Sequence, residues 1–277
     1  MGNDISLSAA VRENLLALAN TESLVARTQN RLSTGLRVAS PIDDARVFFE
    51  AKALSDHAVD MDEKKEGIDQ GVSSVTTALE AIEAIDALAQ QMKGILISAK
   101  SSSGNELVAL QTQYNDLRTQ IDNLANDANY QGLNLIAGTG SSLDIEFSNN
   151  SNSILSIASI DVTTGSLGLA VTSLVNLSVA STLATKIDDS LAEIDAAKET
   201  LRGTAQALGS NVALLQTRLD FTEKYVNALE GGAAKLTLAD ITEEGANLVA
   251  LQTRQQLGFS ALAFAGQSEQ SVLSLFR

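Results

Sequence analysis

Two stretches of the chain, one at each end, repeat apolar residues at alternating intervals of four and three. Near the start, the repeat runs through Leu7, Val11, Leu15, Leu18, Glu22, Val25, Gln29, Leu32 and Leu36. Near the end, it runs through Ile241, Glu244, Leu248, Leu251, Gln255, Gly258, Leu262, Ala265, Glu269, Val272 and Phe276. This spacing predicts helices with one coiled-coil seam each, and such a seam is buried only against a partner. We expect the two ends to pair with each other or with neighbouring copies.

The same helical spacing continues through most of the chain between the two ends. It predicts helices over about residues 41–100, 107–128 and 180–229. Ser40 is a suitable N-cap for the first of these, with Pro41 at the first helical position. Residues 101–105 read as a turn, and Gly231-Gly232 is expected to end the last helix.

A short β-like region interrupts the helical pattern. Tyr130 to Ile136 contain a turn glycine followed by alternation, which predicts a short extended segment. Further on, 143–147 and 160–162 alternate like strands, and Thr164-Gly165 is able to turn a hairpin. The predicted fold is therefore mainly α: a long antiparallel helical bundle or coiled coil with a small β-hairpin insertion and paired N- and C-terminal helices.

The composition favours thin helical bundles. Hydrophobic residues make up 44% of the 277 residues, but aromatic residues only 4%, and Pro41 is the single proline. Long helices tolerate few prolines, and a compact enzyme of this size usually fills its core with more aromatic rings. The absence of cysteine excludes disulfides and thiol chemistry.

The net charge of −15 is carried by the middle of the chain, because residues 1–37 and 236–277 are nearly neutral. Near-neutral ends suit close packing of copies, and the acidic balance argues against nucleic-acid binding. Residues 1–6 lack a basic segment followed by an apolar one, so we expect no cleaved signal peptide. No stretch reaches 18 apolar residues, so we expect no membrane span.

No catalytic, cofactor-binding or metal-binding pattern is found, and we expect neither an enzyme nor a cofactor. His57 is the single histidine, and its neighbours are ordinary surface acids. The acids between Asp60 and Glu66 are interleaved with Lys64 and Lys65, which favours a solvated face over a cation site.

Five polar residues interrupt the two terminal seams: Glu22, Gln29, Glu244, Gln255 and Glu269. Two interpretations stay open. The seams simply tolerate them, or buried polar groups select one alignment between neighbouring helices at some cost in stability.

Three motifs resemble those of bacterial flagellins and occur in the same order. They are Asn30-Arg31-Leu32-Ser33-Thr34-Gly35-Leu36-Arg37-Val38-Ala39-Ser40 followed by Asp43-Asp44-Ala45, then Asn129-Tyr130-Gln131-Gly132-Leu133, and finally Val272-Leu273-Ser274-Leu275-Phe276-Arg277. The resemblance covers about residues 5–136 and 180–277. It is to a short flagellin with a nearly absent outer variable domain.

This resemblance implies a structural subunit that polymerises into the bacterial flagellar filament for swimming. Residues 1–45 plus 235–277 would form an inner coiled-coil domain and spoke, with the paired ends around a central channel. Residues 46–137 plus 179–234 would form a rod-like helical domain, and 138–178 a short surface insertion. Candidate assembly residues are Leu15, Leu18, Val25, Leu32, Leu248, Leu251, Leu262 and Val272. Candidate spoke residues, expected to act through ion pairs, are Arg31, Arg37, Asp43 and Asp44.

The resemblance also implies partners and a location. The expected partners are copies of the chain in a helical homopolymer, an export chaperone on the C-terminal helix, and hook-associated and cap proteins. The expected location is the extracellular filament, reached by type III export. Gln90 stands where many flagellins have an arginine contacted by an innate immune receptor, which argues against that recognition. Alternatives are a hook–filament junction protein and a secreted helical effector or adhesin.

Overall fold

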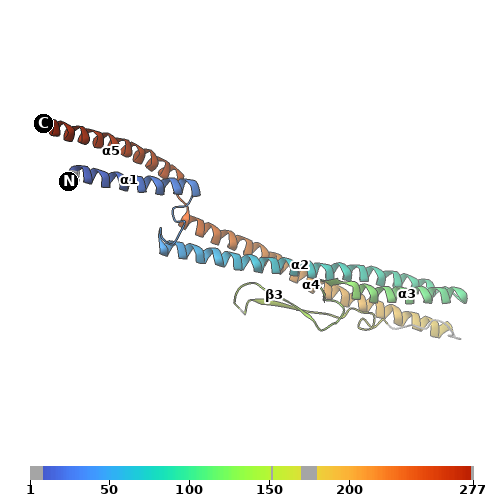
Figure 1. Cartoon of the computed structure of the whole chain (residues 1–277). Coiled ribbons are helices and arrows are strands. Elements are labelled where there is room, and N and C mark those ends of the chain that lie inside the picture. The colour runs from blue at the N-terminus through green and yellow to red at the C-terminus, as the bar shows by residue number, and fades with distance from the viewer. Residues whose placement is uncertain (1–8, 151, 170–179, 276–277) are drawn as a thin grey trace. The chain divides into compact units, whose positions relative to one another are not determined.

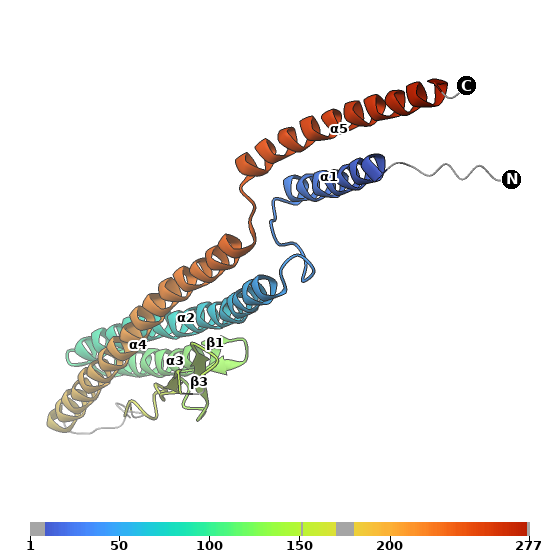
Figure 2. The same ribbon diagram turned by 90° about the vertical axis from the view of Figure 1, so that its left-hand side faces the viewer.

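The computed structural model describes residues 9–150, 152–169 and 180–275 (Figures 1 and 2). Its elements are α1 (Ala9–Thr34), α2 (Ala45–Ala99), α3 (Asn105–Asp127), β1 (Asn129–Tyr130), β2 (Leu133–Asn134), β3 (Ser142–Glu146), β4 (Ile154–Ala158), α4 (Ala180–Thr237) and α5 (Ile241–Leu275). The mainly α fold with a small antiparallel β insertion is confirmed. The chain divides into two compact units: unit 1 is residues 1–57 with 228–277, and unit 2 is residues 58–227.

In unit 1, α1 and α5 lie side by side and run in opposite directions, which confirms the paired terminal helices (Figures 1 and 2). The predicted seam of α5 faces α1 from Glu244 to Ala265, where each seam position is at least half-buried. Gly258 allows the close approach, because a Cβ there would lie 3.2 Å from Leu18 Cδ1. On α1, however, Thr21 and Thr28 are buried and the predicted Glu22 and Gln29 are exposed, so that part of the predicted seam is wrong.

Unit 2 is a bundle of α2, α3 and α4 around a continuous apolar core (Figure 2). Each helix contributes side chains that are almost completely buried: Ile68, Ile82, Ile85, Met92 and Leu96 from α2, Tyr114 and Ile121 from α3, and Ile187, Ile194 and Leu215 from α4. The period of these positions is the helical period that the sequence predicted.

Lysine–aspartate pairs join α2 to α4 along unit 2. In the described part of the chain they are Lys93 with Asp195 at 2.5 Å, Lys100 with Asp188, and Lys198 with Asp86 at 3.7 Å. Lys198 is buried and also donates a hydrogen bond to Gln90 Oε1 at 2.5 Å. The Gln90 side chain is therefore held between the two helices.

The β region consists of two antiparallel pairs. β1 and β2 are joined by Gln131 and Gly132, which both have positive φ, as a tight hairpin turn requires. This confirms the short extended segment. β3 pairs with β4, and Ile145 of β3 packs directly against Gly71 of α2.

The second strand of the hairpin was predicted in the wrong place. The partner of β3 is Ile154–Ala158, reached through a turn in which Ser153 N donates to Asn150 O. Ile160 and Val162 instead donate to the carbonyls of Leu135 and Ile136. Residues 154–158 and 160–162 both alternate like strands, and the turn after β3 brings the first of them into register with β3.

Two helix boundaries also differ from prediction. Pro41 lies in a turn, and α2 begins only at Ala45, where Asp44 caps it by accepting from Val47 N at 3.1 Å. α4 continues through Gly231-Gly232 to Thr237. Buried Ala233 keeps this segment packed, which outweighs a helix penalty of about 1 kcal/mol per glycine.

Candidate assembly interface

The α1–α5 pair buries several polar side chains and leaves several large apolar side chains exposed. Among its described side chains, the buried ones are Val11, Thr21, Thr28 and Glu244. The large apolar side chains that stay exposed are Leu15, Leu16, Ile241, Val249, Leu257, Phe259 and Phe264. In a helix pair whose final state is fully solvated, we would expect the large apolar side chains to be buried and the polar ones exposed.

The predicted assembly residues fall into three groups. Leu18, Val25, Leu32, Leu248, Leu251 and Leu262 are half-buried, within the contact between the two helices of one chain. Leu15 is 39% exposed, on the same side of α1 as the buried Val11 and the half-buried Leu18. Val272 belongs to α5, but its side chain lies outside the described part. The six half-buried positions therefore lie in the contact that pairs the two ends of a single chain.

A second apolar stripe on α5 was missed by the sequence analysis. Val249, Leu257 and Phe264 are 64%, 66% and 71% exposed. At 100° per residue, they lie on the face of the helix opposite the seam that contacts α1. The available signal was that α5 is apolar on more than one side, which is typical of a helix buried all round.

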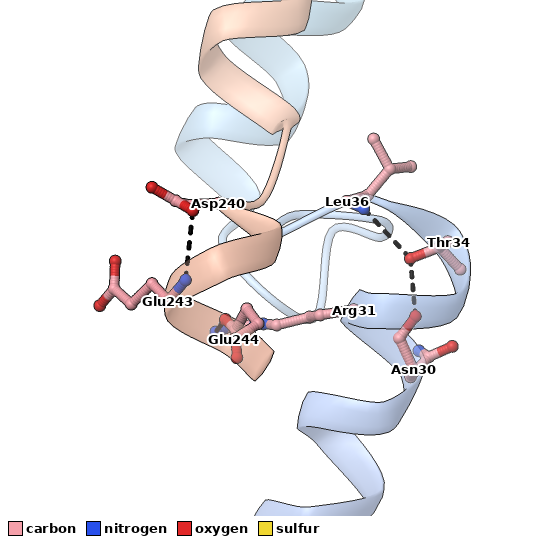
Figure 3. A network of polar contacts seen from close by, with 7 residues as sticks. All are labelled: Asn30, Arg31, Thr34, Leu36, Asp240, Glu243 and Glu244. Carbon is pink, nitrogen blue, oxygen red and sulfur yellow. Dashed lines mark hydrogen bonds and ion pairs between the residues drawn. The ribbon is translucent and has the colours of Figure 1, made fainter. Parts of the chain in front are cut away.

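Glu244 explains one of the polar interruptions in the seams. Its Oε1 accepts a hydrogen bond from Arg31 Nη1 at 2.7 Å, and the side chains are 10% and 27% exposed (Figure 3). Because a buried carboxylate without a partner is costly, this ion pair favours one alignment of α1 and α5. Gln255 is half-buried, and the side chain of Glu269 lies outside the described part.

Side chains form hydrogen bonds with the backbone at the end of α1 and at the start of α5, beside this ion pair (Figure 3). Asp240 caps α5 by accepting from Thr242 N at 2.9 Å and Glu243 N at 3.2 Å. At the end of α1, Thr34 Oγ1 donates to Asn30 O at 2.8 Å and accepts from Leu36 N at 3.2 Å. The ion pair is therefore set on two well-defined helix ends.

The four predicted spoke residues all lie in unit 1 but act in different ways. Arg31 forms the ion pair with Glu244, whereas Arg37 donates to the carbonyl of Leu236 at 2.9 Å. Asp43 accepts from Ala39 N, Ser40 N and Ser40 Oγ at 3.0–3.1 Å, and Asp44 caps α2. Three of the four thus bind backbone groups rather than opposite charges.

Asp43 has a lowered pKa. The hydrogen bonds from the Ser40 backbone and hydroxyl are the main cause, because they stabilise the ionised carboxylate. The turn from Ser40 to Asp44 is consequently fixed by its own side chains at neutral pH.

Comparison with known proteins places the chain in a family. Its residues 5–141 match the bacterial flagellin N-terminal helical region, and residues 184–276 match the bacterial flagellin C-terminal helical region. The flagellin FljM of Caulobacter vibrioides is 32% identical over 277 residues, with 99% of each chain covered. The chain belongs to the bacterial flagellin family. A flagellin of Brucella melitensis is 30% identical, with 95% of each chain covered.

Solved structures agree with the fold of this flagellin. A putative flagellar hook-associated protein from Vibrio parahaemolyticus has a TM-score of 0.58 at 12% identity, with 71% of this chain and 100% of that chain covered. At this identity the likeness extends to the fold alone.

The family makes this flagellin a structural subunit of the flagellar filament, and polymerisation into that filament is the family's activity. The resemblance read from the three sequence motifs is thereby confirmed. Within the part of the chain that the structure describes, every helix is too short or too polar to cross a membrane.

Proposed function

We propose that the α1–α5 pair forms the innermost layer of the filament, around a central channel, and that copies of the chain bury the second apolar stripe of α5 between them. The observation that supports this most is the exposure of Val249, Leu257 and Phe264 on the face of α5 opposite α1. Neighbouring copies are the partner that a filament supplies in every position.

The energetics of this arrangement favour assembly. Burial of one valine, leucine or phenylalanine side chain contributes about 1.5–3 kcal/mol. The second stripe on α5 and the exposed Leu15 and Leu16 on α1 together provide several such side chains per copy. Contacts between different faces of identical subunits extend into a fibre when the rotation between subunits does not close a ring, and a helical filament is such a case.

The proposed layers follow from where the chain ends lie. Residues 1–45 and 235–277 would supply the inner coiled coil and spoke, 46–137 and 179–234 the rod around it, and 138–178 the surface. Both chain ends belong to unit 1, which supports a shared inner position. The candidate assembly and spoke residues keep these roles as part of the proposal.

We further propose export of the chain in an unfolded form to the cell exterior. The absence of cysteine suits passage between compartments without disulfide formation. An apolar second stripe on α5 needs cover before assembly, which supports a chaperone on this helix. Cap and hook-associated proteins would bind the same faces at the two ends of the filament. The chain's work is then assembly and torque transmission rather than catalysis.

Seeded polymerisation of the purified full-length chain tests this function. Filament fragments should elongate by thousands of copies, and a chain lacking residues 236–277 should not elongate them. Growth that stops at a single ring would indicate a hook–filament junction protein. A chain that stays monomeric on every seed would indicate a secreted effector or adhesin, and fibres from the truncated chain would disprove the role of the ends.

A further inference from the structure

Unit 2 contains a pocket of about 270 Å³ whose walls are formed by α2, the β1–β2 hairpin and β3. Leu133, Leu143 and Ile145 supply its apolar lining, and Gly67 and Gly71 line it on α2. A Cβ at residue 67 would meet nothing within 4 Å, so the space beside this glycine is open. The pocket is slightly smaller than ordinary ligand sites of about 300–1,000 Å³, which fits a single small ring.

A buried hydroxyl group in the wall of this pocket has no partner. Ser74 lines the pocket and is 5% exposed, and its Oγ forms no hydrogen bond within the described part of the chain. Its neighbour Ser73 shows the usual arrangement on a helix, because Ser73 Oγ donates to the carbonyl of Asp69 at 3.1 Å. Folded proteins retain few buried polar groups without a hydrogen bond, since each one is destabilising. A ligand in the pocket would satisfy this one.

The other polar groups in the wall are also available to a ligand. Gln70, Tyr130 and Gln131 line the pocket, and their side chains form no hydrogen bond with any residue that the structure describes. Among the described residues of the lining, Asp144 is the only charged one, and its Oδ2 accepts from Ser142 Oγ at 3.2 Å. The wall therefore offers hydroxyl and amide groups that both donate and accept, together with one negative charge.

This lining discriminates between classes of ligand. A phosphate or a carboxylate would meet the negative charge of Asp144 without a cation to bind it. An alkyl chain would leave the polar groups of the wall unpaired, and a quaternary ammonium group prefers a cage of several aromatic rings, whereas Tyr130 is a single one. A neutral sugar ring carries hydroxyls that donate and accept, and its C–H groups suit the apolar lining.

We propose that this pocket binds one neutral sugar ring, with hydrogen bonds from its hydroxyls to Ser74 Oγ and to the amides of Gln70 and Gln131. The inference goes beyond the filament function, and binding by a single chain does not depend on that function. β3 belongs to the segment 138–178, which we propose to form the filament surface. In a filament, the many copies would convert weak binding of one ring into firm attachment to a polysaccharide.

Tyrosine NMR of the purified full-length chain tests this binding. The chain has three tyrosines, so carbon-13 labelling of their rings gives a small set of signals. Tyr130 lines the pocket, whereas Tyr114 is buried in the core and Tyr225 lies on α4. The probes are glucose, galactose, mannose and N-acetylglucosamine, each added alone. We expect at least one of them to shift the Tyr130 signal with a Kd of about 1–10 mM and to leave the Tyr225 signal in place, because so small a ligand binds weakly.

Two pairs of variants locate the binding in this pocket. Ser74→Ala should raise the Kd by about three- to tenfold, because one hydrogen bond to the sugar is lost, and should not lower stability in urea unfolding. Ser73→Ala is its matched control and should leave the Kd unchanged. Gly67→Leu should abolish the shift by filling the pocket. Gly94→Leu, at a position on α2 outside the pocket where a Cβ also meets nothing within 4 Å, should not.

Charged probes test the assigned ligand class. Glucuronate, a sugar ring with a carboxylate, and choline should each shift the Tyr130 signal less than the best neutral sugar does. A stronger response to either charged probe would overturn the proposal. Equal Kd values for Ser74→Ala and Ser73→Ala, or no response of Tyr130 to any neutral sugar, would overturn it as well. These outcomes leave the filament function intact, because seeded growth tests that function separately.

Discussion

Unit 2 and the α1–α5 pair share the same helical spacing of apolar residues but differ in which side chains they bury. In unit 2, side chains such as Ile82, Tyr114 and Ile194 are almost completely buried within one chain. In the pair, threonines and a glutamate are buried, and Leu257 and Phe264 face outward. A single chain therefore fills the core of unit 2, whereas the α1–α5 pair keeps apolar side chains exposed that a neighbour could cover.

This difference shows how one chain combines stability with assembly. A bundle with a filled core folds alone, and an isolated pair of helices with exposed apolar faces is marginal in water. We expect order at the ends to depend on neighbouring copies, so that folding of the pair accompanies growth of the filament. The following substitutions test that division.

The largest effect is expected from a charge on the outward face of α5. Leu257→Glu removes burial worth about 1.5–3 kcal/mol and places a carboxylate in an apolar contact. We expect the critical concentration for seeded growth, measured by sedimentation, to rise by about 10- to 100-fold or more. The circular dichroism of the monomer should stay the same.

Thr253→Val is the matched control, because residue 253 lies between Val249 and Leu257 on the same face. It adds apolar surface and should leave growth intact. A Leu257→Glu chain that assembles as well as Thr253→Val would mean that α5 meets no neighbour on this face.

A smaller effect is expected within the pair itself. Arg31→Met leaves the carboxylate of Glu244 without its hydrogen bond, which should destabilise the α1–α5 pair by about 2 kcal/mol. Hydrogen exchange should become faster in α1 and α5 and stay unchanged in α3. Arg27→Met, on the exposed side of the same helix, is the control and should change neither. Equal acceleration in both variants would argue against an alignment role for the ion pair.

The stability of unit 2 should fall when volume is added between α2 and the β3–β4 hairpin. A Cβ at residue 71 would lie 2.3 Å from Ile145 Cδ1, so Gly71→Ala forces the buried Ile145 side chain to shift and should cost about 1–3 kcal/mol in urea unfolding. Gly67→Ala, one turn earlier with nothing within 4 Å, should instead stabilise by about 0.5–1 kcal/mol. Gly71→Ala combined with Ile145→Ala should recover part of the loss. The prediction fails if both glycine variants shift stability in the same direction.

The smallest effect concerns pH. The Asp43 carboxyl has a pKa below its ordinary value when folded, so its stabilising contribution is present at neutral pH and is lost as pH falls through the folded pKa. A carbon-13 titration of the carboxyl should place its midpoint below that of an unstructured aspartate. In Asp43→Asn, the turn should show no change over this acid range. A midpoint at the ordinary value would show that the hydrogen bonds from Ser40 are not maintained.

The periodicity of the sequence predicted the helices and the α5 seam but not the alignment of α1. Two seams on α1 fit the four–three alternation, and both contain Leu18. One adds Leu15, Glu22 and Gln29, and the other adds Thr21 and Thr28. Threonines do not look like a core, so the first choice was natural and wrong. What decides the alignment is the partner helix, through Gly258 against Leu18 and Glu244 with Arg31.

Local signals failed where contacts distant in sequence decide. Gly231-Gly232 usually ends a helix, but the packing around Ala233 carries α4 past it. Ser40-Pro41 is a good helix start, but the bonds of Asp43 to Ser40 close a turn first and leave the cap to Asp44. The second apolar stripe on α5 is present in the sequence as apolar residues outside the predicted seam. It can be recognised as exposed only when the contact between that seam and α1 is known.

The lysine–aspartate pairs between α2 and α4 have a mechanical consequence. Asp86, Lys93 and Lys100 follow one another at seven-residue intervals on α2, opposite a run on α4 that contains Asp188, Asp195, Lys198 and Arg202. Sliding one helix by two turns would bring Asp86 toward Asp195 and Lys93 toward Asp188 in one direction. In the other direction it would bring Lys93 toward Arg202 and Lys100 toward Asp195. The two pairs formed by Lys93 and Lys100 are partly exposed, and such pairs contribute little to resting stability. Under shear along the helices, however, only the native alignment matches all three pairs, and a slip of two turns in either direction exchanges one of them for a like-charge contact, so the pairs oppose sliding of α2 along α4.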